Sequence, residues 1–446
     1  MFSKILIANR GEIAVRIIRA CKEMGISSVA VFSDADRDSL HVSLADESVC
    51  IGAASAKDSY LNMKAIISAA VATGAQAIHP GYGLLSENAE FAELCEKCSI
   101  TFIGPSADLI RKMGDKDAAR KTMRAAGVPV VPGCDIIEDE STIEEKADEI
   151  GYPLLVKARA GGGGRGIRTV NSRKELKNAF QTASSEALSA FGDGAVYMEK
   201  YLSPVKHIEM QILCDKYGNV ICLGERECSI QHKRQKLLEE SPSPAVNSET
   251  RKKMMEAAKK AAHAVNYVNA GTIEFLMDKS GHFYFMEMNT RLQVEHPVTE
   301  MVTGIDLVKW QIRIASGVPL SYNQEDIKID SCAIECRINA ENPRENFRPC
   351  CGKISFLHVP GGPWVRFDTA LYQGYEVPPF YDSMIGKLIV SAKTREEAIR
   401  KMQAALCELV IEGVEHNAEL QMDILSDSEF KEGKYFTDFI EKRGYA

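Results

Sequence analysis

Two periods of hydrophobic positions alternate along the first quarter of the chain. Short apolar runs, typical of buried strands, are separated by longer segments in which apolar residues recur every three or four positions. Strands that alternate with helices indicate βαβ units and a parallel sheet. The predicted strands are Lys4–Ala8, Ser28–Phe32, Ala75–His79 and Thr101–Ile103, and the predicted helices are Glu12–Met24, Tyr60–Thr73 and Glu87–Lys97. The first strand-to-helix turn, Asn9–Glu12, lacks GxGxxG, so a dinucleotide site there is not supported.

The pattern changes after residue 114. A helix is expected over 115–130, ending at Gly127 with Pro129 beyond it. A smaller subdomain is expected over about 131–203, and strands return over 204–330 with a hairpin at 271–291. The remainder alternates strands with Pro and Gly and ends in helices such as Thr394–Leu409, which indicates an α+β domain. We therefore expect three domains, with the bounds 1–114, 115–330 and 331–446.

Composition narrows the function classes. Hydrophobic residues make up 45% of the 446 residues, charged residues 26%, and the net charge is -8, a balance typical of soluble globular proteins. No Lys/Arg-rich tract is present, which argues against non-specific binding of nucleic acid. The apolar run Ile5–Ala8 is too short for a signal peptide, and no apolar stretch is long enough to span a membrane. We expect a cytoplasmic protein, or an organellar one without its transit peptide.

The 13 cysteines include one CxxC pair, Cys95 and Cys98, on a predicted helix. Zinc would need a second pair at close range, and none is evident, so both are interpreted as reduced thiols of the core.

A glycine-rich loop, Gly161–Gly166, lies between two predicted strands, Pro153–Lys157 and Ile167–Val170. Glycine permits close backbone approach and positive φ, and the exposed N–H groups can then bind phosphate oxygens, as in the flap over ATP in kinases. The alternative is an ordinary flexible surface loop. Lys157 closes the first strand, where an ammonium group can reach a phosphate, although such lysines are often only solvated.

The hairpin at 271–291 carries the most informative polar residues. A turn near Ser280–Gly281 would place Glu274 opposite Glu287. Because side chains alternate along a strand, Glu287, Asn289, Arg291 and Gln293 are expected on one face. Two facing carboxylates and an amide oxygen suit Mg²⁺ or Mn²⁺ with nucleotide phosphates. The alternative is a pair of surface acids.

Arg291, at the end of the hairpin, and Glu295, beyond it, are candidates for catalysis. Arg291 can bind an oxyanion with two parallel hydrogen bonds, and Glu295 is a candidate general base for a small acid such as bicarbonate. Taken singly, each residue is more often part of a structural ion pair.

Motifs along nearly the whole chain resemble those of biotin carboxylases, within the ATP-grasp superfamily, and occur in the family's order. They are KILIANRGEIAVRIIRA, IHPGYGLLSENAEFA, FIGPS, MGDKDAAR, GGGGRGIR, EKYL, CSIQ-x3-QK, EMNTRLQVEHPVTE, ECRINAE, PGG and YDSMIGKL. The resemblance implies a Rossmann-like N-terminal domain, a central ATP-grasp domain with a mobile glycine-flap subdomain, and a C-terminal α+β domain.

The resemblance also implies roles for matching residues. Those expected to bind ATP are Lys116, Lys157, Gly163, Gly164, Glu199, Lys200, Leu202, His207 and Gln231. Those expected to hold two divalent ions are Glu274, Glu287 and Asn289. Those expected around bicarbonate are Lys236, Arg291, Gln293, Val294 and Glu295, with Arg337 and Tyr82 beside biotin. Arg234 stands where the family often has histidine, so a nucleotide contact at that position is not carried over.

The implied reaction has two stages. Glu295 deprotonates bicarbonate, which attacks the γ-phosphate of ATP to give carboxyphosphate and ADP. Carboxyphosphate then releases CO₂ and phosphate, the phosphate removes the biotin N1 proton, and Arg337 stabilises the resulting oxyanion while N1 captures CO₂.

The chain has no AMKM-like motif for attachment of biotin, so biotin is expected on a separate biotin carboxyl carrier protein. Carboxyltransferase subunits and a homodimer are implied too, with dimer contacts near Arg16–Glu23 and Gly361–Arg366. The expected setting is acetyl-CoA carboxylase in fatty-acid synthesis, and a pyruvate, propionyl-CoA or other carboxylase remains open. The rival functions are another ATP-grasp ligase, such as one making carbamoyl phosphate, and a non-catalytic nucleotide-binding regulator.

Overall fold

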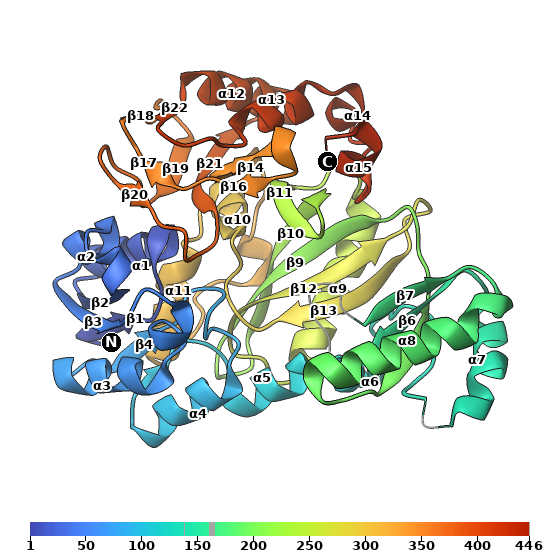
Figure 1. Ribbon diagram of the computed structural model, residues 1–446. Helices are drawn as coiled ribbons and strands as arrows, with labels where there is room; N and C mark the ends of the chain where they lie inside the picture. The colour runs from blue at the N-terminus through green and yellow to red at the C-terminus, as the bar shows by residue number, and fades with distance from the viewer. Residues whose placement is uncertain (138, 160–165, 446) are drawn as a thin grey trace.

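The computed structural model describes residues 1–137, 139–159 and 166–445 (Figure 1). The N-terminal sheet has the order β3-β2-β1-β4-β5, and all its strand pairs are parallel, as expected. Its strands are β1 (Lys4–Ile7), β2 (Ser27–Ser33), β3 (Glu47–Gly52), β4 (Ala77–His79) and β5 (Thr101–Phe102). The accompanying helices are α1 (Gly11–Glu23), α2 (Leu40–Leu44), α3 (Met63–Thr73), α4 (Ala89–Lys97) and α5 (Ala107–Gly114). The edge strand β3 was not predicted, because half of its residues are exposed and its apolar run, 49–51, is only three residues long.

Helix α6 (Lys116–Ala125) follows, and the helix expected over 115–130 is therefore too long. It begins where the Asp115 side chain accepts hydrogen bonds from the N–H groups of Asp117 and Ala118, which is an N-cap. The chain after Gly127 is extended, and the N–H of Phe285 donates to the Pro129 carbonyl at 2.7 Å.

A small three-stranded antiparallel sheet, with the order β7-β6-β8, forms the subdomain at the right of Figure 1. It has a hydrophobic core of its own, to which α7 and α8 contribute. The elements are β6 (Leu154–Ala158), β7 (Ile167–Val170), β8 (Val196–Lys200), α7 (Ile143–Ile150) and α8 (Arg173–Phe191).

The largest sheet has eight strands in the order β13-β12-β9-β10-β11-β14-β21-β19. The first five come from β9 (Lys206–Cys214), β10 (Val220–His232), β11 (Gln235–Ser241), β12 (Asn269–Met277) and β13 (Phe283–Asn289). The last three are β14 (Cys332–Asn339), β21 (Met384–Ala392) and β19 (Val365–Thr369). The sheet thus runs without interruption past residue 330, where a separate domain was expected to begin, because β11 pairs with β14.

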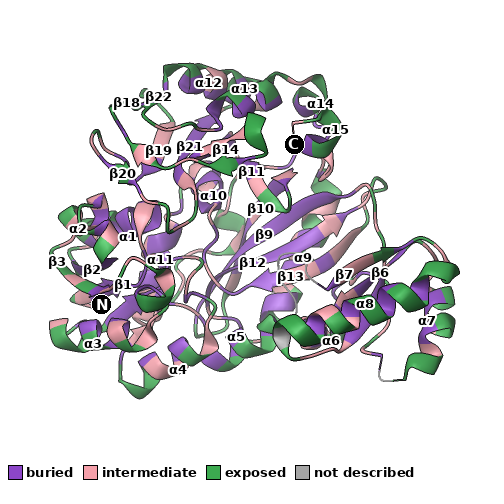
Figure 2. Ribbon diagram, viewed as in Figure 1, coloured by how far each residue is buried: buried purple, intermediate pink, exposed green. Residues whose placement is uncertain are grey.

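Helices cover this sheet and bury its apolar face, as the purple strands of Figure 2 show. They are α9 (Ser248–Ala264), α10 (His296–Thr303), α11 (Leu307–Ala315), α12 (Arg395–Glu408), α13 (Ala418–Ser426), α14 (Ser428–Lys431) and α15 (Phe439–Arg443). Short strand pairs complete the C-terminal part: β15 (Glu341–Asn342) with β16 (Arg348–Pro349), β17 (Gly352–Lys353) with β20 (Glu376–Val377), and β18 (Phe356–His358) with β22 (Val410–Glu412). The observed mixture of α/β and α+β organisation agrees with the expected fold class.

Two further expectations can be compared with the structure. Cys95 is buried, but Cys98 is exposed, so only one of the pair belongs to the core; both are free thiols. Among the described residues, no helix is both long and apolar enough to cross a membrane.

Candidate active site

The hairpin of β12 and β13 pairs Glu274 with Glu287, which confirms the expected register. Its turn is closed by Asp278, whose carboxylate accepts hydrogen bonds from the N–H groups of Ser280 and His282. The register shifts after Glu274, as in a β-bulge, and bulges often redirect side chains near active sites. β13 ends at Asn289, so the expectation that Arg291 and Gln293 continue its alternation is wrong.

Residues 290–295 form a loop between β13 and α10 that folds back onto the hairpin. Pro297 lies in the first turn of α10, where its fixed φ favours the start of a helix. Gln293 Nε2 donates to Glu274 at 2.7 Å, and its Oε1 accepts from Arg226 at 2.9 Å. The loop therefore brings its polar side chains to the hairpin although it does not extend the strand.

Glu274 is surrounded by hydrogen-bond donors. Asn289 Nδ2 lies 2.8 Å and Lys236 Nζ 3.2 Å from its Oε1, while His207 Nε2 lies 3.0 Å from its Oε2. Burial would raise the pKa of Glu274, but Lys236 and His207 outweigh it and lower the pKa strongly. Burial likewise opposes ionisation of His207, yet the Glu274 carboxylate raises the pKa of this imidazole.

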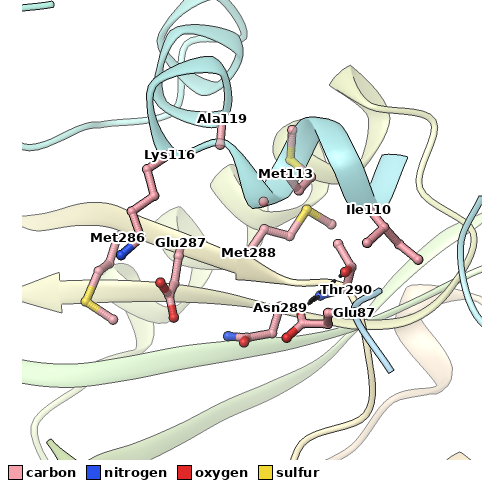
Figure 3. A pocket seen from close by; sticks show the side chains of 11 residues that line it. Glu87, Ile110, Met113, Lys116, Ala119, Met286, Glu287, Met288, Asn289 and Thr290 are labelled. Atoms are coloured by element: carbon pink, nitrogen blue, oxygen red, sulfur yellow. Dashed lines mark hydrogen bonds between the residues drawn. The ribbon is translucent and has the colours of Figure 1, made fainter. Parts of the chain in front are cut away.

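Glu287 lines a cavity of about 180 Å³ between the hairpin and the start of α6. Figure 3 shows Lys116 extending from α6 toward Glu287, with Asn289 and Glu87 further along the cavity. Burial and the like charge of Glu274 both raise the pKa of Glu287. A cation would relieve this repulsion, and the two carboxylates supply the oxygen ligands that Mg²⁺ and Mn²⁺ prefer.

Lys236 joins three buried carboxylates at the centre of the site. Its Nζ donates to Glu209 at 2.7 Å, to Glu274, and through a short hydrogen bond to Glu295. Glu209 also pairs with Arg226, whose side chain is fully buried. No role for Glu209 was predicted, although it follows His207 by two positions and pairs with Glu274 in the sheet. The alternation of side chains along β9 could have identified it.

Glu295, the candidate base, is 2% exposed. Besides Lys236, its carboxylate accepts from Arg337 Nη2 at 3.0 Å. Burial opposes its ionisation, but Lys236, Arg337 and Arg226 hold the pKa of Glu295 well below its ordinary value. Arg337 is held on its other side by Glu239, at 2.7 Å from Nε. The structure thus brings together the predicted residues Lys236, Glu295 and Arg337.

Arg291 lies close to the same hairpin but has different partners. Its Nε donates to Glu87 at 2.9 Å and its Nη2 to Asn289 Oδ1 at 3.1 Å. The amide oxygen that was expected to bind a metal is therefore engaged by the arginine. Glu87, on the loop before α4, was not predicted to belong to the site.

The expected nucleotide residues fall into two groups. Lys157 Nζ donates to Glu199 at 2.5 Å on adjacent strands of the small sheet. The Lys200 ammonium instead contacts the carbonyls of Gly151 and Tyr152, away from Glu199. Leu202 lies in the connection between β8 and β9. Gly163 and Gly164 lie outside the described residues.

On the neighbouring strands, His207 Nδ1 and Gln231 Nε2 are 2.8 Å apart, so two predicted nucleotide residues are in contact. Arg234 lies in the β10–β11 turn with a φ of 69° and is exposed. The Tyr82 hydroxyl donates a short hydrogen bond to Glu12 at the start of α1.

Family profiles cover most of the chain. "Biotin carboxylase, N-terminal domain" matches residues 1–110, and "Biotin carboxylase C-terminal domain" matches residues 335–442. The central residues 115–323 match "Carbamoyl-phosphate synthase L chain, ATP binding domain". Biotin carboxylase profiles match on both sides of the ATP-binding domain. This order of domains favours a biotin carboxylase over a ligase that makes carbamoyl phosphate.

Individual proteins agree with this assignment. "Biotin carboxylase 1" of Bacillus subtilis is 58% identical over 443 residues, covering 99% of this chain and 98% of the relative. The crystal structure of a Campylobacter jejuni biotin carboxylase complex superimposes with a TM-score of 0.95 at 49% identity, covering 99% of both chains. The structure of the biotin carboxylase domain dimer of Hydrogenobacter thermophilus 2-oxoglutarate carboxylase, with MgADP and bicarbonate, superimposes with a TM-score of 0.94 at 50% identity. The match covers 100% of this chain and 98% of that one. The chain therefore belongs to the biotin carboxylase family and is an ATP-dependent carboxylase.

Proposed function

We propose that the chain carboxylates biotin on a separate carrier protein, and that its central buried cluster performs the chemistry. The observation that carries this proposal is the position of the buried Glu295 carboxylate, which forms ion pairs with both Lys236 and Arg337. An ionised carboxylate flanked by two cations can take a proton from bicarbonate, while the cations bind the anion that results.

ATP would bind between the small sheet and the hairpin. Lys116, Lys157 and the glycine loop would contact the phosphates, and His207 and Gln231 would meet the nucleotide from β9 and β10. Glu274 and Glu287 would hold the divalent ions, with Asn289 joining them once its amide oxygen leaves Arg291. The bound Mg²⁺ or Mn²⁺ ions would offset the negative charge of the phosphates.

The first stage uses residues that already lie together. Glu295 removes the bicarbonate proton, and the bicarbonate oxygen attacks the γ-phosphorus of ATP, so that the bond to ADP breaks and carboxyphosphate forms. Lys236, Arg291, Gln293 and Val294 would hold the bicarbonate. Close placement converts the encounter of two anions into an intramolecular step.

In the second stage, carboxyphosphate breaks down to CO₂ and phosphate, and phosphate accepts the N1 proton of biotin. Negative charge then develops on the ureido oxygen, and N1 attacks CO₂. Arg337 would stabilise this charge, because Glu239 and Glu295 fix the orientation of its guanidinium. Tyr82 would lie beside the biotin ring.

We further propose a cytoplasmic homodimer that works with a biotin carboxyl carrier protein and carboxyltransferase subunits in acetyl-CoA carboxylase. A pyruvate, propionyl-CoA or 2-oxoglutarate carboxylase is the alternative setting, and one relative above belongs to a carboxylase of that kind. Trp364, 68% exposed, supports a protein contact at Gly361–Arg366. Arg16 is a poorer candidate for the dimer contact, because Glu300 and Asp306 of the same chain already bind it.

The test is ADP formation by the purified chain with Mg²⁺, ATP and bicarbonate, with and without free biotin. Stimulation by biotin supports the proposal, as does loss of turnover when bicarbonate is removed. Turnover that ignores biotin would indicate another ATP-grasp ligase. ATP binding without turnover, even when biotinylated carrier is added, would favour a regulator.

A further inference from the structure

Lys387 is buried at the junction of three parts of the chain. It lies on β21, where its neighbours in register are Arg337 of β14 and Asp368 of β19, and its side chain is 0% exposed. Its Nζ donates to the main-chain carbonyl of Val294 at 2.8 Å. The same nitrogen lies 3.0 Å from Glu12 Oε1, in the first turn of α1.

The carbonyl that Lys387 contacts lies in the middle of the catalytic loop. The preceding carbonyl, that of Gln293, lies 2.8 Å from His296 Nδ1. Two consecutive peptide planes are thus held by buried side chains. Because each peptide unit is planar, the direction of the Val294 carbonyl also sets the direction of the Glu295 N–H group. The side chains of Gln293 and Glu295 leave the backbone on either side of this anchored unit.

The environment of Lys387 argues against a role in packing alone. An ammonium group is unfavourable in a buried site unless it has partners, and apolar residues of similar volume are often as stable. Glu12 lies beside Lys387, and it also accepts the hydrogen bond from Tyr82. Glu335 is 0% exposed, and neither of its carboxylate oxygens has a hydrogen-bond partner among the described residues. Two buried carboxylates behind the site, those of Glu12 and Glu335, therefore favour an ammonium group at this point.

We propose that Lys387 is a positioning residue that fixes the Val294 carbonyl and thereby shapes the bicarbonate site of Gln293, Val294 and Glu295. This inference rests on the proposed function, in which these residues bind bicarbonate. Among the described residues, the polar partners of Lys387 are Val294 and Glu12, and neither belongs to the small sheet, where Lys157 and Glu199 meet. Loss of Lys387 should therefore affect bicarbonate more than ATP.

The experiment compares Lys387→Met with the double variant Glu12→Gln/Lys387→Met. The single change leaves the Glu12 carboxylate buried without its cation, whereas the double change removes both charges. For each variant, the melting temperature is measured together with the KM values for bicarbonate and ATP, from ADP formation with free biotin. Lys206→Met is a matched control, because this lysine is 4% exposed and its Nζ lies 3.5 Å from Glu227, away from the loop.

We expect Lys387→Met to lower the melting temperature and to raise the bicarbonate KM at least tenfold, with the ATP KM within twofold. The double variant should regain most of the lost melting temperature but keep the raised bicarbonate KM. Lys206→Met should lower the melting temperature without raising the bicarbonate KM.

The inference is overturned if the bicarbonate KM of the double variant returns to the wild-type value, since Lys387 would then serve only as the counter-ion of Glu12. Equal rises in both KM values would also overturn it. If the single variant does not fold, the bicarbonate and ATP KM values of the double variant are compared with those of the wild type instead. Wild-type protein without bicarbonate-dependent, biotin-stimulated turnover would refute the proposed function instead.

Discussion

Replacement of Glu295 by glutamine tests the central assignment with little change of shape. The amide keeps the volume of the side chain but cannot accept a proton from bicarbonate. Lys236 would keep Glu209 at 2.7 Å, and Arg337 would keep Glu239 at 2.7 Å. Neither cation would be left buried without a carboxylate, so the change should affect catalysis far more than folding.

The expected magnitudes differ accordingly. Loss of a positioned general base lowers a rate by about 10²–10⁴-fold, which corresponds to about 3–5 kcal/mol in the activation free energy. Glu295 also accepts two hydrogen bonds from charged donors, but its loss relieves repulsion from Glu239 and Glu274. We therefore expect the free energy of unfolding to fall by no more than about 2 kcal/mol.

The assay is bicarbonate-dependent ADP formation with free biotin, alongside urea denaturation. Glu239→Gln is the matched control, because it removes a carboxylate from the same Arg337, whereas the carboxylates that accept from Lys236 in the described part of the chain are those of Glu209, Glu274 and Glu295. The control should keep kcat/KM for bicarbonate within tenfold of the wild type. If Glu295→Gln is also within tenfold, or if its loss of activity only follows a loss of folded protein, then Glu295 is not the base.

Three further predictions concern stability and metal binding. Arg226→Met should lower the free energy of unfolding by about 3–5 kcal/mol, measured by urea denaturation, because it leaves Glu209 buried beside fewer cations. Replacement of the exposed Arg111 by Met, the control, should change the free energy of unfolding by less than about 0.5 kcal/mol. Equal effects of the two changes would contradict a stabilising role for the buried Arg226–Glu209 pair. Glu287→Gln should raise the Mg²⁺ concentration needed for half-maximal ADP formation at least tenfold, and an unchanged requirement would exclude Glu287 as a ligand. The pKa of Asp368 is about 2, since Arg366 lowers it despite burial. Because this folded-state pKa lies below the unfolded value, the stabilisation, on the order of 2 kcal/mol, is present above about pH 4 and lost as the pH falls toward 2. The difference in unfolding free energy between wild type and Asp368→Asn should therefore shrink over that interval, and a constant difference would refute the linkage.

Local sequence patterns were sufficient to predict much of the hairpin of β12 and β13, which carries the proposed metal ligands. The turn at Ser280–Gly281 and the two-residue alternation placed Glu274 opposite Glu287, and the sheet pairs them in that register. The N-terminal sheet was likewise predictable, because buried parallel strands appear as apolar runs between helices. The prediction failed where the pattern was interrupted, at the exposed edge strand β3 and beyond Asn289, where the strand gives way to a loop.

The sequence by itself determined which residues carry the chemistry, because a metal, a base and an anion each require particular side chains, and those occur in motifs that resemble one family. Only the tertiary structure decided which of them meet. Arg337 reaches Glu295 across 42 positions of the chain, and Lys387 joins Val294, 93 positions away, to Glu12. An element's pattern reports which face it buries but not which other element covers that face. The long-range pairs therefore depend on how the central sheet extends through β11 and β14 and brings β21 beneath the catalytic loop.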